Sequence, residues 1–421
     1  MLAIICPGQG TQTPGMLAPW LELEGARELL TEWSERAGLD LISLGTTADA
    51  ETIAQTQDAQ PLIVATSLLA ATALSSVPFL DFPTPRNWQY QFREDPGSAI
   101  PVPGPQNDGE REHEPQNDQS VKLVETTGSP TIVVAGHSLG AITAAAVAGV
   151  FGYADAVAIA AKRGEFMAEM PRHDHHGEGG MLAVIGSTLD EVHEAAIAAG
   201  LQVATVNAQN QVVVAGPLDK LNDFKPPGRA RTIRLMVSGP FHTAAYHGAA
   251  EKFAAALAAY DIHDPVIPIV NDLDGGIITA LRDPATKFMR SAVNPPKREV
   301  AVPNGSAQDD GEGTPVAAPP PHEFASQIRR HPATAAPPAQ DDVRGAMRAT
   351  EVVNYLIKQV TSPVRWDLVT SQLAEATCII ELAPAGTLTK LARRALTAEI
   401  ISINTPADIA AGRNLLADNL P

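Results

Sequence analysis

The sequence predicts an α/β protein with a mainly parallel sheet and a second, smaller β-rich part. Three observations lead to this fold class. Apolar runs of strand length alternate with helical segments, a serine lies between two glycines directly after one run, and short β-rich pieces gather in mid-chain. Residues 2–6 ("LAIIC") and 131–135 ("TIVVA") each precede a glycine-containing turn and helical patterning, and residues 59–76 indicate a further helix. Strands that alternate with helices in this way favour a doubly wound sheet.

The middle of the chain has a different pattern. Four short β-rich pieces are separated by helical segments at 189–200 and 218–224, and these pieces are residues 181–186, 201–208, 211–216 and 231–237. The order strand–helix–strand–strand–helix–strand is that of ferredoxin-like domains. We therefore expect residues 171–237 to form a ferredoxin-like small subdomain, inserted into a large catalytic subdomain of residues 1–170 and 238–421.

After the inserted part, the chain should return to the parallel sheet. Residues 266–272 ("VIPIVND"), 378–384 ("CIIELAP") and 398–404 ("AEIISIN") are the expected strands. Two stretches break the regular pattern, residues 80–127 and residues 281–346, because both are rich in proline and charge and neither has a hydrophobic period. We expect both to be disordered insertions.

The composition limits the partners and the location of the protein. The net charge of −18 argues against nucleic acid and anionic membrane surfaces as partners. No apolar segment approaches the roughly 18–20 residues of a membrane span, and no secretion signal precedes the first strand. Cys6 and Cys378 lie inside apolar runs, so we expect buried free thiols and a cytoplasmic location.

Residues 136–140 ("GHSLG") place Ser138 between two glycines, after an apolar strand and before an alanine-rich helix. In this context G-x-S-x-G is a nucleophile elbow, whose strained turn projects the serine hydroxyl from the edge of a sheet. The N–H groups and the positive dipole end of the next helix can stabilise an oxyanion. Ser138 is therefore the predicted nucleophile, and the elbow indicates an α/β-hydrolase-like large subdomain.

Two further residues could take part in serine chemistry. His242, in "SGPFHTAAYH", follows a strand and a Gly-Pro turn and precedes a helix, so it is either the base or a helix-capping histidine. Arg163 lies in an otherwise apolar helix, where it either reaches the surface or binds an anion. The planar guanidinium of arginine suits a carboxylate, which would make the anion a charged substrate group.

The other histidines near these motifs are expected to be structural. His137 is adjacent to Ser138 in the chain, so its side chain should point away from the serine hydroxyl. His173, His175 and His176 lie in "RHDHHGEGG", which has the spacing of a surface loop and lacks a second group of ligands. The sequence therefore predicts no metal site.

Seven motifs together resemble the malonyl-CoA:acyl-carrier-protein transacylases, and in their order along the chain they are "CPGQGTQTPGM", "GHSLG", "KRGEFM", "NAQNQVVVAG", "FHT", "QVTSPVRW" and "LAPAGTLTKLARR". The resemblance covers nearly everything outside the two insertions, and the N-terminal part is most similar to the actinobacterial form. It implies an acyltransferase that moves a malonyl group from malonyl-CoA to the phosphopantetheine thiol of acyl carrier protein, through a malonyl-serine, for fatty acid biosynthesis. It implies no cofactor beyond the substrate malonyl-CoA, and we expect a monomer.

The resemblance also implies roles for individual residues. Ser138 would carry the malonyl ester, and His242 would act as its base. Arg163 would pair with the free carboxylate of the malonyl group. The backbone N–H groups of Gln9 and Leu139 would form the oxyanion hole.

Four more residues match the family at or near the site. Gln359, in "QVTSPVRW", would orient the histidine through its backbone carbonyl. Phe241 resembles the malonyl-selective form of the motif, because its ring leaves little room for an α-methyl group. Asn207 and Gln60 match polar positions and are expected to support the site.

The chain departs from the family pattern in two ways. Ala141 stands where glutamate is usual, and we expect this change to affect stability and to leave the chemistry intact. The insertions also separate the motifs by more residues than is usual. Insertions at loop tips would leave the active site unchanged.

Other functions remain open from sequence alone. An α/β-hydrolase-type serine esterase or thioesterase shares the elbow, but its histidine comes late in the chain, whereas a long segment follows His242. A malonyl transferase for polyketide synthesis would share all the motifs, and a catalytically silent binding module would not keep all three key residues. Arg229, Arg231 and Arg234 are either a basic patch for the acidic carrier protein or ordinary charges of an edge strand.

Overall fold

The computed structural model describes residues 1–75, 132–169, 179–237, 239–279 and 340–419. The described residues up to 279 and from 346 onward belong to one compact unit, and residues 280–339 lie outside the described ranges. The expected insertion at 80–127 and the histidines His173, His175 and His176 also lie outside the described residues.

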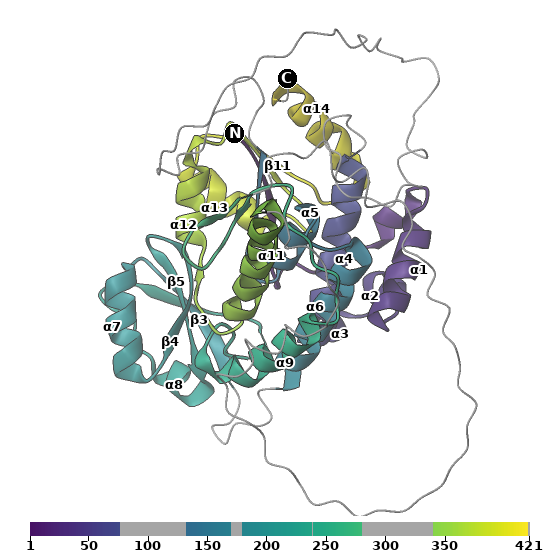
Figure 1. Cartoon of the computed structure of the whole chain (residues 1–421). Helices are drawn as coiled ribbons and strands as arrows, with labels where there is room; N and C mark the ends of the chain where they lie inside the picture. The colour runs from purple at the N-terminus through teal and green to yellow at the C-terminus, as the bar shows by residue number, and fades with distance from the viewer. Residues whose placement is uncertain (76–131, 170–178, 238, 280–339, 420–421) are drawn as a thin grey trace, which may run out of the picture. The chain divides into compact units, whose positions relative to one another are not determined.

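A six-stranded sheet is the centre of the large unit (Figure 1). Its strands lie in the order β11-β10-β1-β2-β7-β8, and every neighbouring pair is parallel except β7 and β8. The strands are β1 (Leu2–Cys6), β2 (Ile132–Gly136), β7 (Ile269–Val270), β8 (Ile277–Ile278), β10 (Cys378–Glu381) and β11 (Glu399–Ser402). The predicted α/β class with a mainly parallel sheet is therefore confirmed.

Both faces of this sheet are buried, as a parallel sheet requires. In β1, Leu2, Ile4 and Cys6 belong to one apolar cluster, while Ala3 and Ile5 belong to the cluster on the opposite face. This alternation follows from the two-residue period of a strand.

Helices cover the two faces unequally. The larger cluster takes residues from α1, α2, α3, α4, α5, α6, α9, α11 and α14, and the smaller one takes residues from α12 and α13. The helices of this unit are α1 (Ala26–Ala37), α2 (Leu41–Thr46), α3 (Ala50–Ala54), α4 (Thr56–Leu74), α5 (Gly140–Val147), α6 (Tyr153–Glu169), α9 (His247–Leu257), α11 (Gln340–Gln359), α12 (Trp366–Gln372), α13 (Thr387–Ala395) and α14 (Ile409–Asn419).

A second sheet has the strand order β6-β3-β5-β4-β9, antiparallel except for the β4–β9 pair. Two helices, α7 (Leu189–Ala199) and α8 (Leu218–Asp223), supply residues to the apolar cluster on one of its faces. Its strands are β3 (Gly179–Ile185), β4 (Gln202–Ala208), β5 (Gln211–Pro217), β6 (Arg231–Arg234) and β9 (Val364–Arg365). Strand β9 therefore joins this sheet from far outside residues 171–237.

The structure corrects two boundaries. Helix α11 begins at Gln340, so residues 340–346 of the second expected insertion are helical. The sequence after Pro338 contains no proline until Pro363 and is rich in good helix formers. Strand β7 covers only part of the predicted 266–272, because Pro268 has no N–H to donate to a neighbouring strand.

The two cysteines are free and buried, as predicted. Cys6 ends β1, whereas Cys378 pairs with Leu2 at the other end of that strand, so the two thiols lie at opposite ends of neighbouring strands. Within the described ranges, none of the helices has the length and apolar character that crossing a bilayer needs.

Candidate active site

Ser138 lies on the turn from β2 into α5, with a left-handed φ of 53°. A Cβ atom on Gly136 would lie 2.0 Å from the backbone carbonyl carbon of Gly140, and one on Gly140 would lie 2.1 Å from the carbonyl oxygen of Cys6. Both positions of the elbow therefore exclude any side chain. The next residue, Ala141, is wholly buried in the apolar cluster of the sheet, where an uncharged side chain fits.

Ser138 and His242 are in hydrogen-bond contact. The Oγ atom of Ser138 lies 2.7 Å from Nε2 of His242, and Nδ1 of His242 lies 2.9 Å from the carbonyl oxygen of Gln359. A carbonyl oxygen can only accept, so Nδ1 carries the hydrogen and the lone pair of Nε2 faces the serine hydroxyl. This is the tautomer that a general base needs.

The backbone of His242 is also left-handed, with φ of 61°. In the described ranges, Ser138 and His242 are the only residues other than glycine with a positive φ. The hydroxyl of Thr243 donates to the carbonyl oxygen of Pro240 at 2.7 Å and so stabilises the turn before α9. Backbone conformations of this kind persist only where the surroundings hold them, and they gather at functional sites.

Arg163 is buried on α6 and does not reach the surface, with 2% of its area exposed. A Cβ on the next residue, Gly164, would lie 2.7 Å from the carbonyl oxygen of Thr56, so α6 approaches the start of α4 very closely. Nη1 of Arg163 donates to Oε1 of Gln60 at 3.0 Å, and Nη2 donates to Oε1 of Gln359 at 3.4 Å.

The side chains that accept hydrogen bonds from Arg163 among the described residues are therefore neutral amides. A buried guanidinium without an anion in contact is costly. An arginine in such a place is suited to bind the charged group of a ligand, and of the two readings left open by the sequence the structure favours the anion site.

Burial shifts the titration of both groups. Desolvation, with the nearby charge of Arg163, lowers the pKa of His242 to about 3, although the hydrogen bond to Gln359 acts in the opposite direction. Burial lowers the pKa of Arg163 to about 10, opposed by the charge of Asp272. At neutral pH the imidazole is therefore neutral and the guanidinium is charged.

The predicted site residues line one cavity of about 450 Å³. Its walls come from the elbow, from α4 and α6, from the inner face of the second sheet and from α13. The predicted residues that line it are Gln9, Gln60, Ser138, Leu139, Arg163, Asn207, Phe241 and His242. Gln359 is not in the wall, but it contacts both His242 and Arg163 from behind.

The backbone N–H groups of Gln9 and Leu139 are the candidates for an oxyanion hole. Both residues line the cavity beside Ser138, and Leu139 is the residue that precedes α5. In the described part of the chain, neither N–H donates to a protein acceptor. Free backbone N–H groups beside the nucleophile, from the turn after β1 and from the start of α5, are of the kind that stabilises a developing oxyanion.

His137 points away from the serine hydroxyl, as predicted. Its Nε2 lies 3.0 Å from Oδ1 of Asn207 on β4, and its ring centroid lies 5.5 Å from that of Trp366. The contact joins the elbow to the second sheet. Across the described residues, no group of acidic, histidine or cysteine side chains could hold a metal ion.

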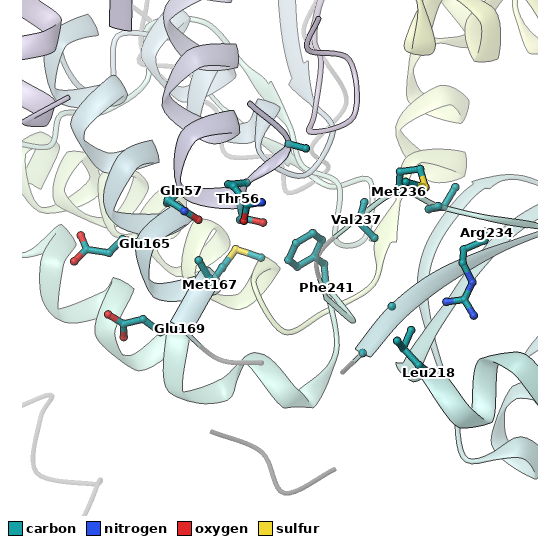
Figure 2. Close-up of a pocket in the computed structure, with 16 residues that line it drawn as sticks. Thr56, Gln57, Glu165, Met167, Glu169, Leu218, Arg234, Met236, Val237 and Phe241 are labelled. Carbon is teal, nitrogen blue, oxygen red and sulfur yellow. The ribbon is translucent and has the colours of Figure 1, made fainter. Parts of the chain in front are cut away.

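A second cavity of about 1080 Å³ shares a wall with the first. Figure 2 shows Phe241 and Met167 directed toward one another in it, with Glu165 and Glu169 turned away. Both cavities are lined by Met167, Leu235, Met236, Val237 and Phe241. Phe241 and Met167 are therefore part of the wall that the two cavities share.

One residue in contact with the site was not predicted from the sequence. Asp272 is fully buried and lies just after β7, where its Oδ2 accepts the backbone N–H of Ser138 at 2.7 Å. An acid directly after a strand at the carboxyl edge of a parallel sheet is a signal that could have drawn attention to it.

Comparison with known proteins places this geometry in a family. Residues 120–275 match the family model of the acyl transferase domain. The chain is 32% identical to the malonyl CoA-acyl carrier protein transacylase of Mycobacterium tuberculosis over 420 residues, which is 99% of this chain and 100% of that protein.

A second relative and a solved structure agree. The malonyl CoA-acyl carrier protein transacylase of Escherichia coli is 31% identical over 305 residues, which is 70% of this chain and 81% of that protein. The crystal structure of MCAT from Mycobacterium tuberculosis superposes with a TM-score of 0.68 at 31% identity, covering 98% of this chain and 100% of that one. With a relative this similar along almost its whole length, the chain belongs to the malonyl-CoA:acyl-carrier-protein transacylase family.

Proposed function

We propose that the protein transfers the malonyl group of malonyl-CoA to the phosphopantetheine thiol of acyl carrier protein, for fatty acid biosynthesis. The observation that carries this proposal is the hydrogen-bonded series Ser138–His242–Gln359 beside a buried, charged Arg163 in one cavity. The series supports a serine nucleophile, and the arginine supports an acyl group that carries its own carboxylate.

In the first half of the reaction, Oγ of Ser138 attacks the thioester carbonyl while its proton moves to Nε2 of His242. The N–H groups of Gln9 and Leu139 stabilise the oxyanion of the tetrahedral intermediate. When the carbon–sulfur bond breaks, the proton on His242 passes to the leaving thiolate of CoA. Ser138 then holds the malonyl ester.

In the second half, the carrier thiol takes the place of CoA. His242 accepts the thiol proton, the sulfur attacks the ester carbonyl, and the bond to Oγ breaks as the proton returns to Ser138. A thioester is consumed and a thioester is formed, so the transfer needs no cofactor and no energy source.

Arg163 binds the free carboxylate of the malonyl group. Gln60 and Gln359 hold the guanidinium in place, and its remaining N–H groups can donate to the two carboxylate oxygens. The charge is remote from the reacting carbonyl, so this contact orients the substrate and leaves the reacting atoms free.

The surroundings of the site support the remaining parts of the proposal. Strand β6, with Arg231 and Arg234, is an exposed edge of the second sheet, and Arg229 lies just before it. These arginines are a candidate contact surface for the acidic carrier protein. We propose in addition a cytoplasmic monomer; the net charge of −18 disfavours nucleic acid and anionic membranes as partners.

The two sheets correspond to two subdomains in this proposal. The parallel sheet with the elbow is the α/β-hydrolase-like large subdomain, and residues 171–237 are the ferredoxin-like small subdomain. The order β3-α7-β4-β5-α8-β6 and the strand order β6-β3-β5-β4 support this division.

One experiment tests the function. The protein is incubated with labelled malonyl-CoA, its intact mass is measured, and holo acyl carrier protein is then added. We expect one malonyl group on Ser138, absent in Ser138→Ala, that moves to the carrier thiol. An adduct that is lost to water at the same rate with and without carrier would indicate an esterase. Preference for a polyketide-type carrier protein would indicate that the malonyl group supplies polyketide synthesis.

A further inference from the structure

The buried carboxylate of Asp272 accepts three hydrogen bonds. Its Oδ2 takes the backbone N–H of Ser138 at 2.7 Å. Its Oδ1 takes the hydroxyl of Tyr355 at 2.8 Å and the Nε2 amide of Gln359 at 2.7 Å. The carboxylate therefore joins the elbow to α11, which carries both Tyr355 and Gln359.

The arrangement suits an ionised carboxylate. Each oxygen faces a donor, and an ionised carboxylate is the side chain that accepts on both oxygens. Burial raises the pKa of Asp272, while the hydrogen bonds from Gln359 and Ser138 lower it. Three donors are the compensation that a buried charge needs.

The hydrogen bond between Gln359 and Asp272 connects the carboxylate to both functional groups of the site. The backbone carbonyl of Gln359 orients His242, and its Oε1 accepts from Arg163. With its oxygen toward Arg163, the amide of Gln359 directs its NH2 group to the other side, where a buried donor needs an acceptor. Asp272 is that acceptor.

We propose that Asp272 is a positioning residue that fixes the orientation of the Gln359 amide and thereby aligns Arg163 for the substrate carboxylate. This inference rests on the proposed function, because it concerns the arginine that selects malonyl. Asp272 touches neither substrate nor reacting atoms, and it acts through Gln359.

An amide in place of the carboxylate makes the inference testable. In Asp272→Asn, the NH2 group must face either the N–H of Ser138 or the amide nitrogen of Gln359, and both are donors. Rotating the Gln359 amide relieves the second conflict, but it then presents an NH2 group to Arg163. The hold on a malonyl carboxylate should weaken, while an acetyl group, which has no carboxylate, should be affected less.

The test compares the rates at which malonyl-CoA and acetyl-CoA acylate Ser138, followed by intact mass. We expect Asp272→Asn to lower the malonyl-to-acetyl ratio of kcat/KM by about tenfold or more, the loss expected for a hydrogen bond to a charged group. Tyr355→Phe is the matched control, because it removes a hydrogen bond to the same carboxylate without reversing the Gln359 amide. It should leave the ratio within about twofold of the wild type.

Gln359→Met gives a second measurement, which also serves if Asp272→Asn does not fold. It keeps the backbone carbonyl that orients His242, and it removes both side-chain hydrogen bonds. We expect a similar fall in the ratio, and no further fall when the two changes are combined, because both act through one amide. An unchanged ratio in either single variant, or equal losses for the two substrates, would overturn the inference. A wild-type protein that forms no malonyl-Ser138 would instead overturn the proposed function.

Discussion

The Nε2 atom of His242 lies 2.7 Å from Oγ of Ser138, and the same imidazole is kept neutral by burial beside the positive charge of Arg163. Both are needed for base catalysis, because only a neutral imidazole has a lone pair on Nε2 to accept the proton of the serine hydroxyl. The low pKa of His242, about 3, favours the base in its unprotonated form, and the substrate carboxylate can offset the charge of Arg163 once it binds.

The buried neutral histidine should make the protein sensitive to acid. His242 titrates near its ordinary value in the unfolded chain but near 3 in the folded one, so between these values the unfolded state binds more protons. Folding stability should therefore fall as the pH drops below about 6.5, by up to about 1.4 kcal/mol per pH unit. Urea unfolding at pH 7, 6 and 5 measures this slope.

In the same series, His242→Gln should reduce the pH slope, because the titrating group is gone. His247→Gln is the matched control, since His247 is exposed on α9 beside Glu251 and should leave the slope unchanged. Equal slopes in the wild type and His242→Gln would show that other groups cause the acid sensitivity.

Removing the guanidinium of Arg163 should lower the rate of malonyl transfer much more than the rate of acetyl transfer. Arg163→Ala is expected to lower kcat/KM for malonyl-CoA by about 100-fold or more, the scale of a buried charge pair that loses one partner. Acetyl-CoA has no carboxylate and should lose less than about tenfold. Lys162→Ala, which removes an exposed neighbouring cation paired with Glu165, should change neither. Losses of the same size for both substrates would contradict the carboxylate role.

The wall between the two cavities predicts a change in acyl selectivity. Phe241→Ala should open the serine cavity toward the larger one and raise the methylmalonyl-to-malonyl ratio of kcat/KM by about tenfold or more, the value of one methyl group in a pocket. Leu218→Ala is the control, because Leu218 lines the larger cavity alone. If the ratio rises equally in both variants, the wall at Phe241 is not what excludes the branch.

Adding a single methyl group to a glycine of the elbow should destabilise the fold. In Gly140→Ala the new methyl group would lie 2.1 Å from the carbonyl oxygen of Cys6, so β1 or α5 must move, and we expect a loss of more than about 3 kcal/mol in the free energy of unfolding. Gly152→Ala has open space around its Cβ and should cost less than about 1 kcal/mol. A Gly140→Ala protein as stable as Gly152→Ala would mean that the elbow can relax.

Local patterns were sufficient for the elbow and for most strands. The glycines around Ser138 are required by sterics within a few residues, and that requirement is visible as G-x-S-x-G. The pairing of Ser138 with His242 needed the family resemblance, because nothing local relates two residues so far apart in the chain. The surroundings of Arg163 cannot be predicted from the sequence for the same reason, since a position in a helix does not show which groups pack around it.

The parts that were missed depend on tertiary contacts. Asp272 gains its importance from three segments that meet only in the fold: the elbow, the end of β7 and α11. Strand β9 is two residues long, too short to have a pattern of its own, yet it extends the second sheet beside β4. The start of α11 was hidden by the composition of the segment before it.

The single serine cavity also determines the order in which substrates can come and go. This cavity of about 450 Å³ is lined by Ser138, His242 and Arg163, and in the proposed function the thioester donor and the accepting thiol both approach Oγ of Ser138 there. In the proposed reaction both thiols react at the same Oγ, so the CoA thiol has to leave before the carrier thiol can attack the malonyl ester. Free CoA therefore competes with the carrier for the malonyl-enzyme, so accumulated CoA should inhibit the transfer of malonyl groups to the carrier.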